Sequence, residues 1–160
     1  MNKKELSDFL EAYDFIEDMS GKTIVNLIKT TAIMRAVYDE LFQKHSISEP
    51  KFLVLLLLSQ EPEGMPFSEI GRKLLVSRAN MTGLIERMMK EGLVEKILNP
   101  SDKRSTKALL TQKGRKLFEG VKDDHIEFSR RMTAGIGDDE KELLSKLLKK
   151  LQNDIVDSFE

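Results

Sequence analysis

Asp102, Lys103 and Arg104 stand together in the segment NPSDKRS, residues 99–105, whose composition predicts a turn. The preceding Asn-Pro-Ser and Asp102 itself suit a turn for local reasons, but a turn does not require two bases directly behind them. An arginine guanidinium is attracted to phosphate, and a neighbouring carboxylate can hold it in one direction through charge-assisted hydrogen bonds. These residue types at this spacing therefore indicate recognition of an anionic partner.

Charge is unevenly distributed along the 160-residue chain, although the formal net charge is only -1. Residues 72–116, which we call the basic window, contain 12 Lys and Arg against 4 Asp and Glu. Acidic residues are in excess before and after this window. A basic middle between acidic flanks is typical of a polyanion-binding element, and a solvated basic face is the alternative.

The elements that would position these bases are mostly helices, because apolar residues recur at helical spacing over most of the chain. Helices are predicted over 4–18, 22–44, 49–58, 68–75, 78–91, 112–134 and 138–158, and strands over 93–98 and 105–110, around a turn at 99–104. Two short helices around a tight turn, followed by a hairpin, indicate a winged helix-turn-helix. The expected fold class is therefore mainly α with a small β-hairpin wing.

Capping residues predict where several of these helices begin and end. Ser68, Ser77 and Thr111 are predicted N-caps, and Gly92 is expected to end the helix that follows Ser77. A break at Ser20-Gly21 is expected to separate the first two helices.

The predicted helix 78–91 has two distinct faces. Its expected core residues are Met81, Leu84, Ile85 and Met88. Its more outward residues are Arg78, Asn80, Thr82 and Arg87. Arginine and asparagine suit base edges, whereas serine and threonine suit phosphates. Two alternatives remain open: Ser77 caps the helix with or without a nucleic acid, and Arg87 could pair with Glu91 on the surface.

Two stretches in this order resemble the MarR family of bacterial transcriptional regulators. SEIGRKLLVSRANMTGLIERMMKEGLVEK, residues 68–96, is similar to the family's helix-turn-helix, and DKRSTKALLTQKG, residues 102–114, is similar to its wing. The resemblance implies that Arg104 enters the DNA minor groove beside Lys103, with Asp102 supporting it. It also implies that Ser77, Arg78, Asn80 and Thr82 form the early face of the recognition helix. Gly83 departs from the basic residue of many members, which leaves the operator sequence open.

We expect a single domain over 1–160, with dimerisation helices at 1–45 and 112–160 around a DNA-binding region at 49–111. The outer helices carry apolar stripes that need a partner surface, which a two-fold homodimer supplies. The stripes are Leu6, Phe9, Leu10, Tyr13 and Ile16, and Leu144, Leu147, Leu148, Leu151, Ile155 and Phe159. Such a dimer would bind an inverted-repeat operator in double-stranded DNA.

The family resemblance further implies a repressor that a small aromatic or phenolic effector releases. Met34, Tyr38, His45 and Phe52 are the candidate pocket residues, and plain core packing is their alternative role. No cofactor is expected. The neighbouring Asp124, His125 and Glu127 suggest a solvent-exposed face of a helix. They do not suggest a metal site, because a metal ion needs several converging ligands.

Other classes of protein remain as alternatives. A winged-helix module that binds proteins instead of DNA is the first, and a small enzyme is the second, although no motif places a catalytic acid, base or nucleophile. The chain contains no cysteine, its start is too acidic for a signal peptide, and its longest apolar run, FLVLLLL at 52–58, is too short to span a bilayer. We therefore expect a cytoplasmic protein without membrane contact.

Overall fold

A computed structural model describes residues 3–12, 15–99 and 102–158, with the backbone alone at 3, 6, 99 and 102–105. The chain forms two compact units, residues 1–122 and 123–160. The helix α6 continues from the first unit into the second. The elements are α1 (Lys3–Glu11), α2 (Met19–Lys44), α3 (Glu49–Ser59), β1 (Met65–Pro66), α4 (Phe67–Lys73), α5 (Arg78–Lys90), β2 (Val94–Asn99), β3 (Asp102–Leu110), α6 (Gln112–Met132) and α7 (Asp138–Asp157).

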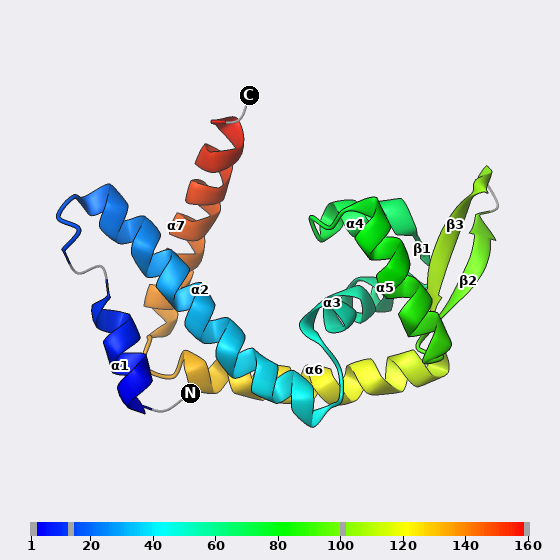
Figure 1. The fold of residues 1–160 in the computed structure, drawn as a ribbon, viewed down its shortest axis with the longest axis horizontal. Helices are drawn as coiled ribbons and strands as arrows, with labels where there is room; N and C mark the ends of the chain where they lie inside the picture. Colours follow the sequence, from blue (N-terminus) through cyan, green and yellow to red (C-terminus); the bar gives the residue numbers. More distant parts are fainter. Residues whose placement is uncertain (1–2, 13–14, 100–101, 159–160) are drawn as a thin grey trace. The chain divides into compact units, whose positions relative to one another are not determined.

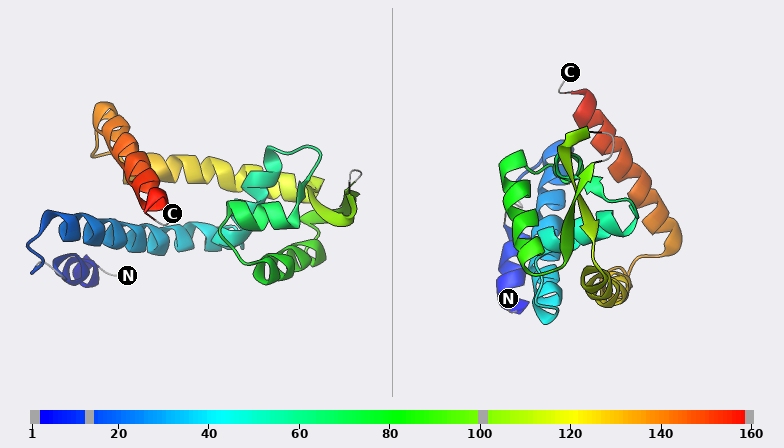
Figure 2. Two further views of the ribbon diagram at one scale, coloured as in Figure 1. Left: turned by 90° about the horizontal axis from the view of Figure 1, so that it is seen from above. Right: turned by 90° about the vertical axis from the view of Figure 1, so that its right-hand side faces the viewer.

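The mainly helical fold with a small sheet agrees with the predicted fold class. In the first unit, α4 and α5 lie beside the β2–β3 hairpin, which stands out as a wing (Figure 1). Two further views show α5 and the hairpin next to each other (Figure 2). No helix in the described part of the chain is long and apolar enough to cross a membrane.

The N-terminal helices differ from the prediction. The helix expected over 4–18 ends at Glu11, and α2 begins at Met19, so Ser20 and Gly21 lie inside α2. The reason is a cap, because the Asp18 carboxylate accepts a hydrogen bond from the Gly21 N–H at 2.7 Å. Tyr13 of the predicted stripe lies outside the described residues.

The core of the first unit surrounds α3, whose Phe52, Val54, Leu55 and Leu58 are all buried. The Phe52 ring lies 5.3 Å from the Phe42 ring of α2 and 6.0 Å from the Phe118 ring of α6, measured between centroids. Aromatic packing therefore connects α2, α3 and the first half of α6.

The sheet has three strands in the order β1-β3-β2, all antiparallel. Its short strand β1 was not predicted, because two residues are too few for a periodic pattern. Gly64 precedes β1 at φ +71°, where a Cβ atom would lie 2.6 Å from the Ala108 carbonyl oxygen. Pro66, and not the predicted Ser68, is the N-cap of α4.

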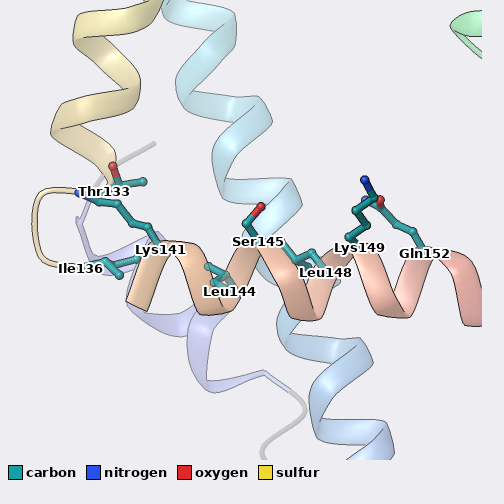
Figure 3. A pocket seen from close by; sticks show the side chains of 8 residues that line it. All are labelled: Thr133, Ile136, Lys141, Leu144, Ser145, Leu148, Lys149 and Gln152. Atoms are coloured by element: carbon teal, nitrogen blue, oxygen red, sulfur yellow. The ribbon is translucent and has the colours of Figure 1, made fainter. Parts of the chain in front are cut away.

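In the second unit, α7 begins where Gly137 donates its N–H to the Glu140 carboxylate at 2.8 Å. None of the residues of α7 is buried, and its exposed apolar side chains include Leu143, Leu144 and Leu147. A groove of about 410 Å³ runs along this helix and the segment before it (Figure 3). Its lining combines Ile136, Leu144 and Leu148 with the polar or charged Thr133, Lys141, Ser145, Lys149 and Gln152. Phe159 of the predicted stripe lies outside the described residues.

Candidate nucleic-acid interface

A close helix-helix approach sets the geometry of α4 and α5. Gly71 of α4 is buried, and a Cβ atom there would lie 3.0 Å from the Val76 carbonyl oxygen and 3.5 Å from the Met81 Cβ. The Val76 N–H in turn donates to the Gly71 carbonyl at 2.8 Å. The predicted core residues Met81, Leu84, Ile85 and Met88 are buried, which fixes the outward face of α5.

Polar side chains surround the N-terminus of α5. The Ser77 hydroxyl accepts a hydrogen bond from the Asn80 N–H at 3.4 Å, so Ser77 is the N-cap as predicted. Arg78 and Asn80 are exposed beside it. The free N–H groups and the dipole of a helix N-terminus attract phosphate, so a cation and an amide stand where an anion is favoured.

Thr82 and Arg87 lie further along α5. The Thr82 hydroxyl donates to the Arg78 carbonyl at 2.9 Å, so this proton is already engaged inside the helix. Thr82 is half-buried, whereas Arg87 is exposed. In this arrangement Thr82 has its methyl group and the hydroxyl lone pairs to offer, and a methyl group suits contact with thymine.

The C-terminus of α5 is held by two lysines. Lys51 of α3 forms an ion pair with the Glu91 carboxylate at 2.6 Å, and Lys113 of α6 donates to the Glu91 carbonyl at 2.7 Å. Cations near the end of a helix are stabilised by its dipole. Among the described contacts Glu91 pairs with Lys51, and not with Arg87 as the alternative interpretation required.

Strand β3 of the wing begins at Asp102, three residues earlier than the strand predicted over 105–110. Asp102, Lys103 and Arg104 lie on β3, with Asn99 opposite Asp102, and not in a turn over 99–104. The register pairs Leu98 with Thr106 and then Asn99 with Asp102, so it shifts between Leu98 and Asn99 and gives Lys103 and Arg104 no partner among the described residues of β2. Pro100 and Ser101 lie outside the described part of the chain. The three charged residues are therefore on the strand that leaves the wing tip.

Thr111 and Gly114 fasten the base of the wing to α6. The Thr111 hydroxyl donates toward the Gly92 and Leu93 carbonyls and accepts from the Gly114 N–H at 3.0 Å, which makes it the cap that the sequence predicted. A Cβ atom on Gly114 would lie 2.0 Å from the Leu93 carbonyl oxygen, so only glycine fits. This contact positions the wing relative to α6, and the sequence indicated it only as part of a family motif.

The turn between α4 and α5 contains a residue that sequence reasoning missed. Leu75 has φ +53°, a left-handed conformation that costs a residue with a side chain roughly 1–2 kcal/mol. Its side chain is 95% exposed. The exposed cations Arg72 and Lys73 precede it, and Arg78 follows it. The only signal available in the sequence was a leucine where turns of this kind often contain glycine.

The predicted pocket residues lie in different environments. Phe52 is 3% exposed and belongs to the aromatic core, while the Tyr38 ring stacks on Phe42 at 5.9 Å between centroids. Met34 is exposed on α2, and His45 is half-buried at the C-terminal end of α2. Tyr38, Phe42 and Phe52 thus form a continuous aromatic row, and the pocket itself stays a prediction.

The described residues contain no group of three or more His, Asp and Glu side chains arranged to hold a metal ion. Partial burial lowers the pKa of His125 below the usual value of an imidazole.

A helix-turn-helix with an exposed polar N-terminus on its second helix, followed by a hairpin, defines the winged-helix class of DNA-binding proteins. The sequence model of the MarR family matches residues 47–106, from the connection before α3 into β3. The chain is 30% identical to the HTH-type transcriptional regulator YsmB of Bacillus subtilis, over 78% of this chain and 84% of YsmB. It is 26% identical to the HTH-type transcriptional repressor YetL of the same species, over 91% of this chain and 87% of YetL.

Solved structures share this fold. AbsC, a MarR family regulator from Streptomyces coelicolor, aligns with a TM-score of 0.80 at 20% identity, over 88% of this chain and 96% of AbsC. NadR in complex with 4-hydroxyphenylacetate aligns with a TM-score of 0.67 at 23% identity, over 79% of this chain and 89% of NadR. The chain belongs to the MarR family, and it is a DNA-binding transcriptional regulator.

Proposed function

We propose that two copies of this chain bind an inverted-repeat operator in double-stranded DNA, with α5 in the major groove and the wing beside it. The observation that carries the proposal is the exposed N-terminus of α5, where Arg78 and Asn80 stand next to the Ser77 cap inside the basic window. In this arrangement Ser77 and Thr82 face the phosphates and thymine methyl groups. Arg87 supplies a further cation, and Lys103 and Arg104 reach the minor groove with Asp102 as support.

The second copy is proposed because α7 leaves its apolar side chains uncovered within its own unit. Leu147 is 55% exposed, and Leu143 and Leu144 beside it are exposed as well. Apolar surface of this kind usually marks an interaction site. A two-fold dimer covers it and presents two recognition helices to half-sites about one DNA turn apart.

Selection of duplexes from a random-sequence library by the full-length protein tests this proposal. We expect enrichment of an inverted repeat whose half-site centres are about 10 base pairs, or a multiple, apart. Enrichment of an unrepeated site, or no enrichment at all, would contradict it. Binding of a protein partner with no DNA selection would favour the alternative of a protein-interaction module.

The proposed regulation is repression that a small aromatic or phenolic anion relieves. The repressor name of YetL and the 4-hydroxyphenylacetate in the NadR structure support it, and both are properties of those proteins. Here the aromatic row of Tyr38, Phe42 and Phe52 offers an apolar wall. Met34 on α2 and His45, the C-cap of this helix, are proposed to complete the pocket. With 4-hydroxyphenylacetate as the probe, we expect release of the protein from its selected duplex, and Tyr38→Ala, which removes the first ring of the aromatic row, should raise the concentration required. No release at millimolar 4-hydroxyphenylacetate would contradict this choice of effector.

A further inference from the structure

The turn between α4 and α5 requires a left-handed backbone at residue 75, because the Val76 N–H donates to the Gly71 carbonyl, but it does not require a leucine there. The left-handed φ of +53° is one that glycine adopts without strain, and the Leu75 side chain is 95% exposed to water. Glycine at this position would relieve the backbone and remove an apolar group from solvent. Strained residues cluster at functional sites, and an exposed apolar side chain at such a residue points to a contact outside the local fold.

The surroundings of Leu75 indicate what it would contact. The exposed cations Arg72 and Lys73 precede it, and Ser77, the N-cap of α5, follows two residues later. Lys73 lies 3.4 Å from the Glu69 carboxylate. A docking surface made of protein would still have to desolvate the exposed Arg72 and Arg78 together with the leucine, which is costly unless each arginine is paired. DNA offers phosphates to the cations and, between them, apolar deoxyribose faces and thymine methyl groups to the leucine.

We propose that Leu75 is a DNA-contacting residue that packs on deoxyribose or a thymine methyl group where the N-terminus of α5 meets the backbone. This inference rests on the proposed function. It adds an apolar contact to a surface otherwise described by charge and hydrogen bonding. Because the turn holds Leu75 through the Val76-to-Gly71 hydrogen bond of 2.8 Å, the side chain is presented without a large conformational change.

The experiment measures binding of a duplex of about 30 base pairs, selected by the wild-type protein from a random library, by fluorescence anisotropy. Leu75→Ala and Leu75→Gly are expected to weaken binding about threefold to tenfold, because part of a leucine side chain loses its apolar contact. The dependence of affinity on salt should stay unchanged, since no phosphate contact is lost. Leu75→Met keeps the apolar volume and should bind within about twofold of the wild type.

Ser46→Gly is the matched control. Ser46 is also exposed at φ +53°, but it lies in the connection between α2 and α3. Both glycine variants should raise the melting temperature, by about 2 °C each, because both relieve the same backbone conformation. Only Leu75→Gly should weaken DNA binding. A variant that is more stable and yet binds less well cannot be explained by damage to the fold.

Wild-type affinity in both Leu75→Ala and Leu75→Gly would overturn the inference and leave the proposed function standing. Equal weakening by Ser46→Gly and Leu75→Gly would also overturn it, because the loss would then come from backbone freedom. A wild-type protein that selects no duplex would instead overturn the proposed function itself.

Discussion

Arg104 is the residue on which the wing's proposed role depends most. It lies on β3 close to the wing tip, beside Lys103 and Asp102. Arg104→Ala is expected to weaken binding of the selected duplex by about 1–3 kcal/mol, because a guanidinium contact to the DNA is lost. The melting temperature should stay close to that of the wild type. Asp102→Ala should weaken binding less, since Arg104 remains but loses its fixed direction, and unchanged affinity in Arg104→Ala would refute the proposed wing contact.

Gly114 and Gly120 are two glycines of α6 with opposite expected responses to alanine. A Cβ on Gly114 would collide with the Leu93 carbonyl oxygen at 2.0 Å and the Leu110 side chain at 2.9 Å, whereas nothing lies within 4 Å of one on Gly120. Gly114→Ala should therefore lower the free energy of unfolding by about 1–3 kcal/mol. Gly120→Ala should stabilise it by about 0.5–1 kcal/mol, because alanine is the better helix former. Denaturant unfolding measures both, and equal stabilities would contradict the close contact at the base of the wing.

At the scale of the elements, the sequence predicted helices well where capping and periodicity agreed. Ser77 and Thr111 cap α5 and α6 as expected, and the buried face of α5 is the one that apolar spacing indicated. The failures came from interactions that override local patterns. The Asp18 cap includes Gly21 in α2, and pairing with β2 draws Asp102 out of the turn into β3. The left-handed Leu75 depends on the packing of α4 against α5, which spacing cannot reveal.

The helix α7 carries the prediction about assembly. Leu147→Glu should convert the protein to a monomer at micromolar concentration, because it places a charge in the proposed apolar interface. Lys150→Glu is the control, since it exchanges a charge at an exposed position on the same helix. Deletion of residues 139–160 should have the same effect as Leu147→Glu and also abolish specific DNA binding. Analytical ultracentrifugation measures the mass, and a dimeric Leu147→Glu variant would remove α7 from the proposed interface.

For the whole molecule, the asymmetry of charge is more informative than its sum. The basic window has a net charge opposite to that of the segments on both sides of it. Some of its cations serve the fold, since Lys113 holds the end of α5 and Lys73 lies 3.4 Å from Glu69. The exposed Arg72, Arg78, Arg87, Lys90 and Lys96 remain available to an anionic partner. A dimer would have twice as many available cations, which is sufficient for contacts with several phosphates.

The most direct test of DNA recognition through this surface is the affinity for the selected duplex as a function of salt. If about six phosphates are contacted, the affinity should fall at least about a hundredfold between about 50 and 200 mM salt, because bound counterions are released on association. A scrambled duplex of the same composition should bind more weakly at every concentration. An affinity that does not change with salt, or that is equal for both duplexes, would contradict sequence-specific DNA recognition through the basic surface.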